Sequence, residues 1–135
     1  MNITIPTTER RQVVDLTDIL AEQCRGKSGH LCLIVQHSTA AITTANLDAG
    51  TDLDLLDALA GMIPQLQWRH EHNPGHAPDH LLASIVGPNV VIPVTDGSLQ
   101  LGQWQRIVLV EFKGPRDCHV DVSFIGANEA PGIAL

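Results

Sequence analysis

Apolar and polar side chains alternate over residues 118–125, and this pattern constrains the fold more than any other. Cys118, Val120, Val122 and Phe124 alternate with His119, Asp121 and Ser123. A period of two is that of a β-strand with one packed face and one polar face. Segments 90–92, 99–101 and 106–112 also have strand composition, with a turn at Asp96-Gly97. The last third of the chain is therefore predicted to be β-structure.

The first third predicts two strands, a short helix and a central strand. Residues 2–5 and 11–16 are short, β-branched segments with polar residues between them, which suggests that they pair. Thr17 can cap the helix that follows, and Gly26 stands past its end. Residues 31–35 form a continuous apolar run, which is consistent with a central strand covered on both sides.

Two further helices are predicted in the middle third. The first begins at Thr51-Asp52 and is ended by Pro64. Its core-facing stripe is expected to contain Leu53, Leu56, Ala60 and Ile63. The second covers residues 79–85, is stopped by Gly87-Pro88, and carries His80 in its first turn.

Together these elements predict an α+β fold with a β-sandwich-like core of short, mostly antiparallel strands and two or three covering helices. The length of 135 residues is typical of one domain, so residues 1–135 are expected to form a single unit. Apolar residues make up 44% of the chain and aromatic residues only 3%, so the core has to be aliphatic.

Charge and cysteine usage argue against several classes of protein. With a net charge of −7 and 8 Lys and Arg residues, the chain lacks the dense basic face that general binding to nucleic acid or acidic membranes requires. Its three cysteines have no zinc or disulfide spacing and are expected to be reduced, buried thiols. There is no signal-peptide pattern and no apolar run near the roughly 20 residues that span a bilayer. We therefore expect a soluble, cytoplasmic protein with no membrane or nucleic-acid partner.

Histidines are the strongest candidates for chemistry. Four of the seven, His70, His72, His76 and His80, fall within eleven positions. His37 follows the strand at 31–35 and precedes two hydroxyl residues. Imidazole can act near neutral pH as an acid, a base, a metal ligand or a donor to phosphate. His72 and His76 can equally be exposed side chains of a polar loop. A metal site of His37, His70 and His80 is chemically reasonable, although spacing alone does not show it.

Three further features have open interpretations. Glu111 shares a strand face with Ile107 and Leu109, so it lies either at the rim of a sheet or beside a partner. The cationic turn 113–116 is either solvated or a phosphate grip in which Arg116 supplies a bidentate fork. Trp104 either fills the core or forms an aromatic wall of a ring-binding pocket.

Five short motifs occur in a characteristic order between about residues 13 and 126. They are His37-Ser38-Thr39-Ala40-Ala41, Trp68-Arg69-His70, His80-Leu81, Leu101-Gly102-Gln103-Trp104-Gln105 and Glu111. In this order and spacing the sequence resembles the secondary thiamine-phosphate synthase, or YjbQ-like, family.

The resemblance implies an α+β fold, a homotrimer and a pocket in which His37, His70 and His80 converge. The implied reaction joins a pyrimidine pyrophosphate to a thiazole phosphate and releases pyrophosphate. The residues expected to act in catalysis are His37, His70, His80 and Glu111. Those expected to contact a small phosphorylated substrate are Ser38, Thr39, Asn46, Arg69, Trp104, Gln105 and Arg116. The three histidines are also the expected ligands of a divalent metal, Mg or Zn.

Two departures from the family pattern bear on turnover. Relatives often carry Asn-Glu where Asn46-Leu47 stands here, and an acid common before the helical histidine is replaced around Gly75-His76. If those acids hold a metal or act as a base, this chain binds its ligand without the same turnover. Two alternatives therefore stay open: a non-catalytic binding protein for a small phosphorylated metabolite, and a metal-assisted hydrolase.

Overall fold

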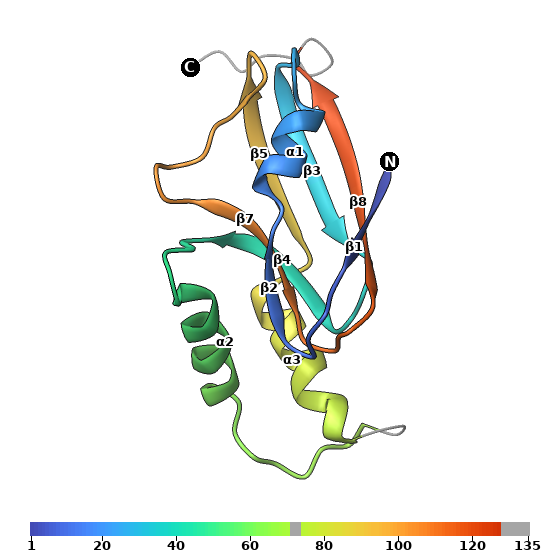
Figure 1. Cartoon of the computed structure of the whole chain (residues 1–135). Helices are drawn as coiled ribbons and strands as arrows, with labels where there is room; N and C mark the ends of the chain where they lie inside the picture. The colour runs from blue at the N-terminus through green and yellow to red at the C-terminus, as the bar shows by residue number, and fades with distance from the viewer. Residues whose placement is uncertain (71–73, 128–135) are drawn as a thin grey trace, which may run out of the picture.

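The computed structural model describes residues 1–70 and 74–127, and it confirms the predicted α+β class (Figure 1). Helices separate groups of two strands in the first half, and four strands follow one another at the end. The elements are β1 (Asn2–Pro6), β2 (Gln12–Asp15), α1 (Thr17–Gln23), β3 (Gly29–Val35), β4 (Ala40–Ala45), α2 (Thr51–Gly61), a 3-10 turn (Pro74–His76), α3 (Ala77–Val86), β5 (Asn89–Thr95), β6 (Ser98–Leu99), β7 (Arg106–Glu111) and β8 (Asp117–Gly126).

The strands form two antiparallel sheets. The larger has the order β1-β8-β3-β5-β6 and the smaller the order β2-β7-β4. The predicted pairing of the first two strands is wrong, because β1 pairs with β8 and β2 with β7. The chain between them bonds to the loop after β7 instead: Thr7 N donates to Arg116 O, and Gly114 N donates to Arg10 O, both at 2.8 Å. The connection therefore carries the chain from one sheet to the other.

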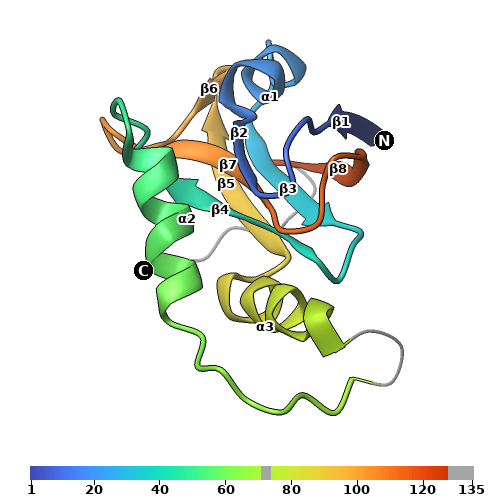
Figure 2. The ribbon, with the colours of Figure 1, turned by 60° about the horizontal axis from the view of Figure 1, so that its bottom comes forward.

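β7 lies at the centre of the molecule, between two apolar layers. Ile107 and Leu109 pack into the core shared by the two sheets. Val108 and Val110 point the other way, into a second core with Leu82 of α3 and the side chains of α2. Figure 2 shows α2 and α3 on this outer side of the smaller sheet, while α1 lies near the ends of β5 and β6. The prediction of an aliphatic core with covering helices is confirmed.

The outer face of the larger sheet is exposed in this chain, which makes the prediction for residues 31–35 wrong. Burial alternates along β3, and Ile34 is 44% exposed. Neighbouring Val91 of β5 and Ile125 of β8 are 53% and 44% exposed on the same face. The continuous apolar run of β3 therefore has one face packed in the core. Its other face is also apolar, but no other described part of the chain covers it.

The helices differ from their predictions in detail. Thr17 is the first residue of α1 rather than its cap. Its hydroxyl does not cap the helix, and it accepts a hydrogen bond from Ile107 N of β7 at 2.8 Å. In α2, Leu53 is 62% exposed and Ala60 is exposed, whereas Leu59 is buried, so the packed stripe is shifted toward Leu59. The second predicted helix is confirmed as α3, although it starts two residues earlier. The predicted strand 99–101 is reduced to Ser98–Leu99.

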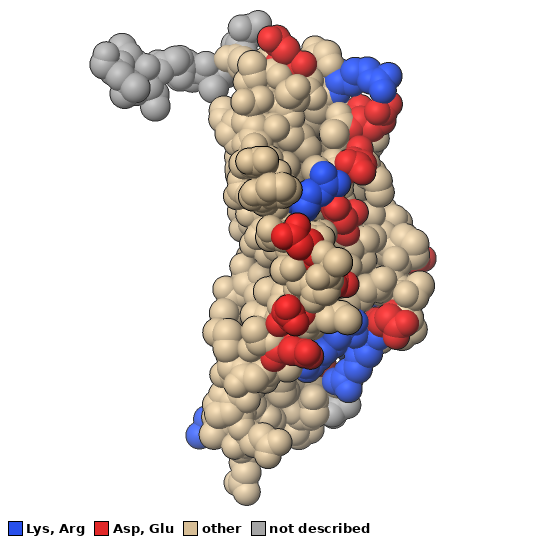
Figure 3. Space-filling view, turned by 60° about the vertical axis from the view of Figure 1, so that its left-hand side comes forward, with Lys and Arg blue, Asp and Glu red and all other residues tan. Residues whose placement is uncertain are grey.

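The cysteines are reduced, as their spacing predicted. Cys24, Cys32 and Cys118 are free thiols, and all but the half-buried Cys32 are buried. Within residues 1–70 and 74–127, the helices are all too short or too polar to cross a membrane. On the face in Figure 3, acidic and basic side chains stand beside one another along one side, and the other side is largely uncharged.

Candidate functional site

Three structural elements meet where the predicted site residues converge. β3 ends at Val35, and His37, Ser38 and Thr39 form the short connection to β4. The first residue of β4 pairs with Glu111 at the end of β7, which brings that carboxylate beside the same connection. Helix α3 packs on β4 and presents His80 near its N-terminus. Tertiary pairing thus assembles parts that are far apart in sequence.

His80 is held by a backbone carbonyl and faces a second histidine. Its Nδ1 lies 3.1 Å from the carbonyl oxygen of Ser38. Because a carbonyl only accepts hydrogen bonds, Nδ1 carries the hydrogen, and Nε2 of neutral His80 has a free lone pair. The Nε2 atom of His70 lies 3.0 Å from that lone pair, with the two rings edge to face. His70 is therefore the donor in this pair when His80 is neutral.

His37 has a different environment. Its Nε2 accepts a hydrogen bond from the backbone N of His119 at 2.9 Å, and the two rings stack with centroids 5.6 Å apart. Burial lowers the pKa of His37, the positive charges of Arg116 and His119 lower it further, and the nearby Glu111 only partly opposes them. His37 is therefore neutral at pH 7, with its hydrogen on Nδ1.

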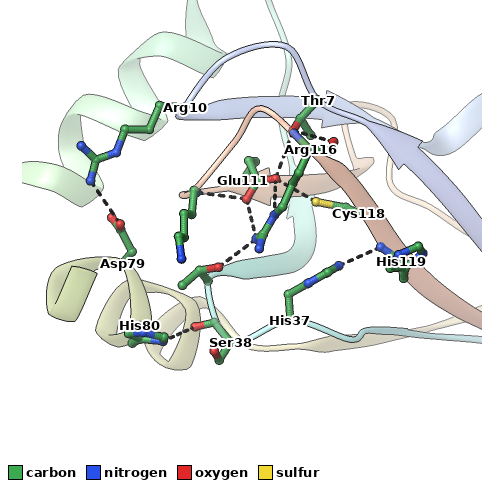
Figure 4. A network of polar contacts seen from close by, with 12 residues as sticks. Thr7, Arg10, His37, Ser38, Asp79, His80, Glu111, Arg116, Cys118 and His119 are labelled. Atoms are coloured by element: carbon green, nitrogen blue, oxygen red, sulfur yellow. Dashed lines mark hydrogen bonds and ion pairs between the residues drawn. The ribbon is translucent and has the colours of Figure 1, made fainter. Parts of the chain in front are cut away.

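Glu111 is the centre of a buried polar network (Figure 4). Arg116 grips its carboxylate with Nε at 3.0 Å and Nη2 at 2.8 Å, and the same Nη2 donates to Thr39 Oγ1 at 2.8 Å. Thr7 Oγ1 and Cys118 Sγ donate to Glu111 Oε2 at 3.1 and 2.8 Å. Of the two positions predicted for Glu111, the partnered one is thus observed. The guanidinium of Arg116 makes its bidentate contact with Glu111 of the same chain.

These contacts set the ionisation of the network. Burial alone would raise the pKa of Glu111, but the hydrogen bonds from Arg116, Cys118 and Lys113 N outweigh it and hold the pKa below its usual value. Burial would lower the pKa of Arg116, which the Glu111 contacts raise instead. Burial and the Glu111 carboxylate raise the pKa of Cys118 to about 12. At neutral pH the network is an ion pair with a protonated thiol.

Two pockets adjoin His80. The first, of about 490 Å³, has a largely apolar wall with cationic and imidazole groups. It is lined by Leu66, Gln67, Trp68, Arg69, His70, Ala77, His80 and Leu81. The second, of about 410 Å³, is lined by His37, Ser38, Ala40, His80, Ala83, Ser84 and Pro88. The structure therefore brings His70 to His80 on one side and His37 to His80 on the other.

The described residues contain no group of three or more His, Cys, Asp or Glu placed to hold a metal ion. His76 is half-buried at the N-cap of α3, and His72 lies outside the described residues. For binding a metal, the pair His70 and His80 has a more suitable geometry than His37, since the two Nε2 atoms converge there. The Nε2 of His37, by contrast, is already bonded to a backbone amide.

Three residues predicted to contact substrate lie at the opposite end of the smaller sheet. Trp104 and Gln105 precede Arg106, which pairs with the last residue of β4, and Asn46 follows that residue. Trp104 is 64% exposed, so the interpretation as a core side chain is wrong. Gln105 bonds to Gly102 N at 2.7 Å and to Thr44 Oγ1 at 3.3 Å. Their substrate role stays a prediction.

A family model described as UPF0047 protein YjbQ-like matches residues 1–127. The chain belongs to this family. A UPF0047 protein of Mycobacterium bovis is 43% identical over 107 residues, which cover 77% of this chain and 83% of that protein. The UPF0047 protein YugU of Bacillus subtilis is 34% identical over 119 residues, covering 83% and 88% of the two chains.

Solved structures agree with the YjbQ-like assignment. The structure of a YbjQ-like protein from Sulfolobus solfataricus has a TM-score of 0.84 and 34% identity, and the match covers 93% of this chain and 95% of that one. A conserved hypothetical protein from Thermus thermophilus has a TM-score of 0.83 and 29% identity, covering 93% and 99%. The similarity to these structures supports the family assignment and the fold.

Three residues of this YjbQ-like site were missed as site residues from sequence. Trp68 lines the first pocket, although it had been noted only as the start of the Trp68-x-His70 motif. Asp79 is completely buried directly before His80, whereas the family pattern had directed attention to a missing acid around Gly75-His76. Thr7 enters the Glu111 network from 104 positions away, and no local signal could have found it.

Proposed function

We propose that this chain binds a small phosphorylated metabolite with a flat ring at His80, and joins it to a second ring in a thiamine-phosphate-synthase-like condensation. The observation that carries the proposal is the position of His80 between two pockets of different character. Leu66, Trp68 and Leu81 give the first pocket a wall that suits a planar ring. Arg69 at that wall supplies a cation for phosphate.

The reaction makes modest demands on the protein. A thiazole ring nitrogen forms a bond to the methylene carbon of a pyrimidine methyl pyrophosphate. The carbon–oxygen bond breaks, and its electron pair leaves with pyrophosphate. The attacking nitrogen carries no hydrogen, so no base has to remove one. The need is for donors that stabilise charge on the leaving oxygens, and Arg69 lines the pocket where its guanidinium can donate to them.

The second pocket is assigned to the partner substrate. Ser38 and Ser84 place hydroxyl groups there, beside His37 and His80. Because its pKa is lowered, His37 offers a neutral hydrogen-bonding group rather than a positive charge. The charges of Glu111 and Arg116 neutralise each other, so neither is available for a substrate. In this proposal the pair instead holds Thr39, and with it the connection after β3, in place.

A divalent metal suits His70 and His80 better than all three histidines. Zinc binds histidine nitrogens at about 2.0–2.1 Å, so ligands in adjacent positions lie about 3 Å apart. The two Nε2 atoms are 3.0 Å apart, and the Ser38 carbonyl on His80 Nδ1 is the usual outer partner of a metal-bound histidine. Nitrogen donors favour zinc over magnesium. A bound ion would supply positive charge for the pyrophosphate.

The test is product formation by the purified chain. Both substrates are supplied, and coupled product and pyrophosphate are measured by mass spectrometry before and after chelation. We expect product from the unmutated chain and from Asp57→Asn, an exposed control on α2, and none from His80→Ala. Binding that His80→Ala abolishes, without any product from the unmutated chain, would replace the synthase by a binding protein. Hydrolysis of either substrate that chelation abolishes would indicate the metal-assisted hydrolase.

Binding without turnover is the second candidate because the fork of Arg116 is occupied. Its Nε and Nη2 both bond to Glu111, so the expected phosphate grip in the turn 113–116 is engaged within the protein. Such a site can hold an anion through Arg69 while offering fewer donors to a leaving group. The assay above separates the two candidates, since only the synthase consumes its ligands.

We also propose that the chain forms a homotrimer. The outer face of the larger sheet exposes Ile34, Val91 and Ile125, and exposed apolar patches commonly mark surfaces of association. Light scattering should give three times the chain mass at micromolar concentration. Ile34→Lys should shift the mass toward the monomer, and a stable monomer of the unmutated chain would contradict the proposal.

A further inference from the structure

A fully buried carboxylate next to His80 is held by two arginines from a distant turn. Asp79 has 0% exposure of its side chain, and each of its oxygens binds one guanidinium. Arg10 Nη2 lies 3.2 Å from Oδ2, and Arg11 Nη2 lies 3.2 Å from Oδ1. With one arginine on each oxygen, the carboxylate cannot rotate without breaking a contact. Figure 4 shows Asp79 and His80 on the same helix, with Arg10 reaching Asp79.

The turn that carries these arginines is itself anchored. Gly114 N donates to the carbonyl of Arg10 at 2.8 Å, which ties the turn to the loop after β7. Thr7, just before the turn, belongs to the Glu111 network. Asp79 is therefore linked through a few hydrogen bonds to the buried Glu111 carboxylate.

The connection that leads toward α3 is irregular. Residues 64–70 contain neither helix nor strand, and Figures 1 and 2 show this connection running well away from the sheets. The side chains of α3 in the second apolar core are those of Leu82, Ala83 and Val86, which lie beyond its first turn. The contacts of Asp79 with Arg10 and Arg11 are a buried, charged link between the first turn of α3 and the turn before β2.

We propose that Asp79 is a positioning residue that fixes the first turn of α3 and so holds His80 Nδ1 on the carbonyl of Ser38. The hydrogen on Nδ1 leaves the Nε2 lone pair of His80 facing His70. Without the link from Asp79 to the two arginines, the His80 ring loses this fixed orientation. The proposal deepens the function proposed above because it concerns the same histidine, but its first readout needs no ligand.

The test compares Asp79→Asn with Asp57→Asn, in which an exposed acid of α2 is changed in the same way. Proteins labelled with 15N-histidine report which ring nitrogen of His80 carries hydrogen, and His80→Gln assigns the signal. We expect the unmutated chain and Asp57→Asn to have hydrogen on Nδ1 of His80, protected from exchange. Asp79→Asn should give a mixture of both tautomers and rapid exchange of that hydrogen.

Arg10→Gln and Arg11→Gln keep the test decisive if Asp79→Asn does not fold. Each removes one of the two contacts, so each should give a partial shift of the His80 tautomer, and both together a larger one. If the variants melt at lower temperature while the His80 signal is unchanged, Asp79 only stabilises the fold and the proposal is overturned. A changed His80 signal with no substrate binding by any protein would leave this proposal standing and reject the proposed function.

Discussion

The two ends of β7 carry the same kind of ion pair in opposite surroundings. At its start, Arg106 binds Asp15 at 2.8 Å and Asp18 at 3.1 Å, with side chains 35%, 35% and 90% exposed. At its end, Glu111 is completely buried and binds Arg116 at 2.8 Å. Water competes for the first pair and cannot reach the carboxylate of the second. The buried pair therefore organises the polar contacts around it, while the exposed pair contributes little.

The largest expected effect comes from removing the buried acid. Glu111→Ala leaves Arg116 without its partner and Thr7 and Cys118 without an acceptor. Breaking a buried pair from one side costs about 3–5 kcal/mol, so urea unfolding should show a loss of this size. A loss below about 1 kcal/mol would mean that water replaces the carboxylate freely and that the two ends are alike.

The next effect is alkaline and belongs to Cys118. Its pKa is raised from 9.0 to about 12 in the folded chain, so the stabilisation is complete below pH 9 and is lost as pH rises toward 12. Across that range stability should fall by about 1.4 kcal/mol for each pH unit, because only the unfolded thiol ionises. Cys118→Ala should have a flatter profile above pH 9 in unfolding experiments. Equal slopes would contradict a thiol held protonated by Glu111.

A smaller effect is expected in mild acid from His37. Its folded pKa lies below the ordinary 6.5, so the unfolded chain takes up the proton first as the pH falls. Stability that is constant above about pH 7 should therefore decline below pH 6.5. His37→Gln, which keeps an acceptor for His119 N, should reduce that decline. A His37 signal that titrates above pH 6.5 in NMR would contradict a pKa lowered by burial and by the charge of Arg116.

The smallest effect is expected at the exposed end. Arg106→Gln removes contacts with two acids that water already solvates, and exposed pairs contribute about 0–1 kcal/mol. Its loss of stability should also shrink with added salt, unlike that of Glu111→Ala. A loss as large as that of Glu111→Ala, independent of salt, would remove the distinction between the two ends.

Local patterns predicted much of the fold because they depend on periodicity. The alternation in β8 and the stop signals of α3 are examples: Cys118 and Val120 are buried, and Gly87 ends the helix. The wrong predictions concern partners. A short β-branched segment does not reveal which strand it pairs with, and an apolar run like that of β3 does not reveal whether a second layer covers it.

The candidate site was predictable in its histidines and less so in its supporting residues. Family motifs indicated His37, His70 and His80, and the structure relates all three through His80. The contacts of Asp79 with Arg10 and Arg11 span 69 and 68 positions and follow no local pattern. Such contacts arise from tertiary packing, so only coordinates reveal them.

The most direct test of the account asks which tryptophan binds the ring. Trp68 lines the pocket beside His80, whereas Trp104 stands at the other end of the smaller sheet. The measurement is calorimetric titration of a pyrimidine methyl pyrophosphate into the unmutated chain, Trp68→Ala and Trp104→Ala. We predict that Trp68→Ala weakens binding by about tenfold or more, which corresponds to about 1.4 kcal/mol, and that Trp104→Ala leaves it nearly unchanged. Binding that is lost in Trp104→Ala and retained in Trp68→Ala would contradict a ligand site at His80.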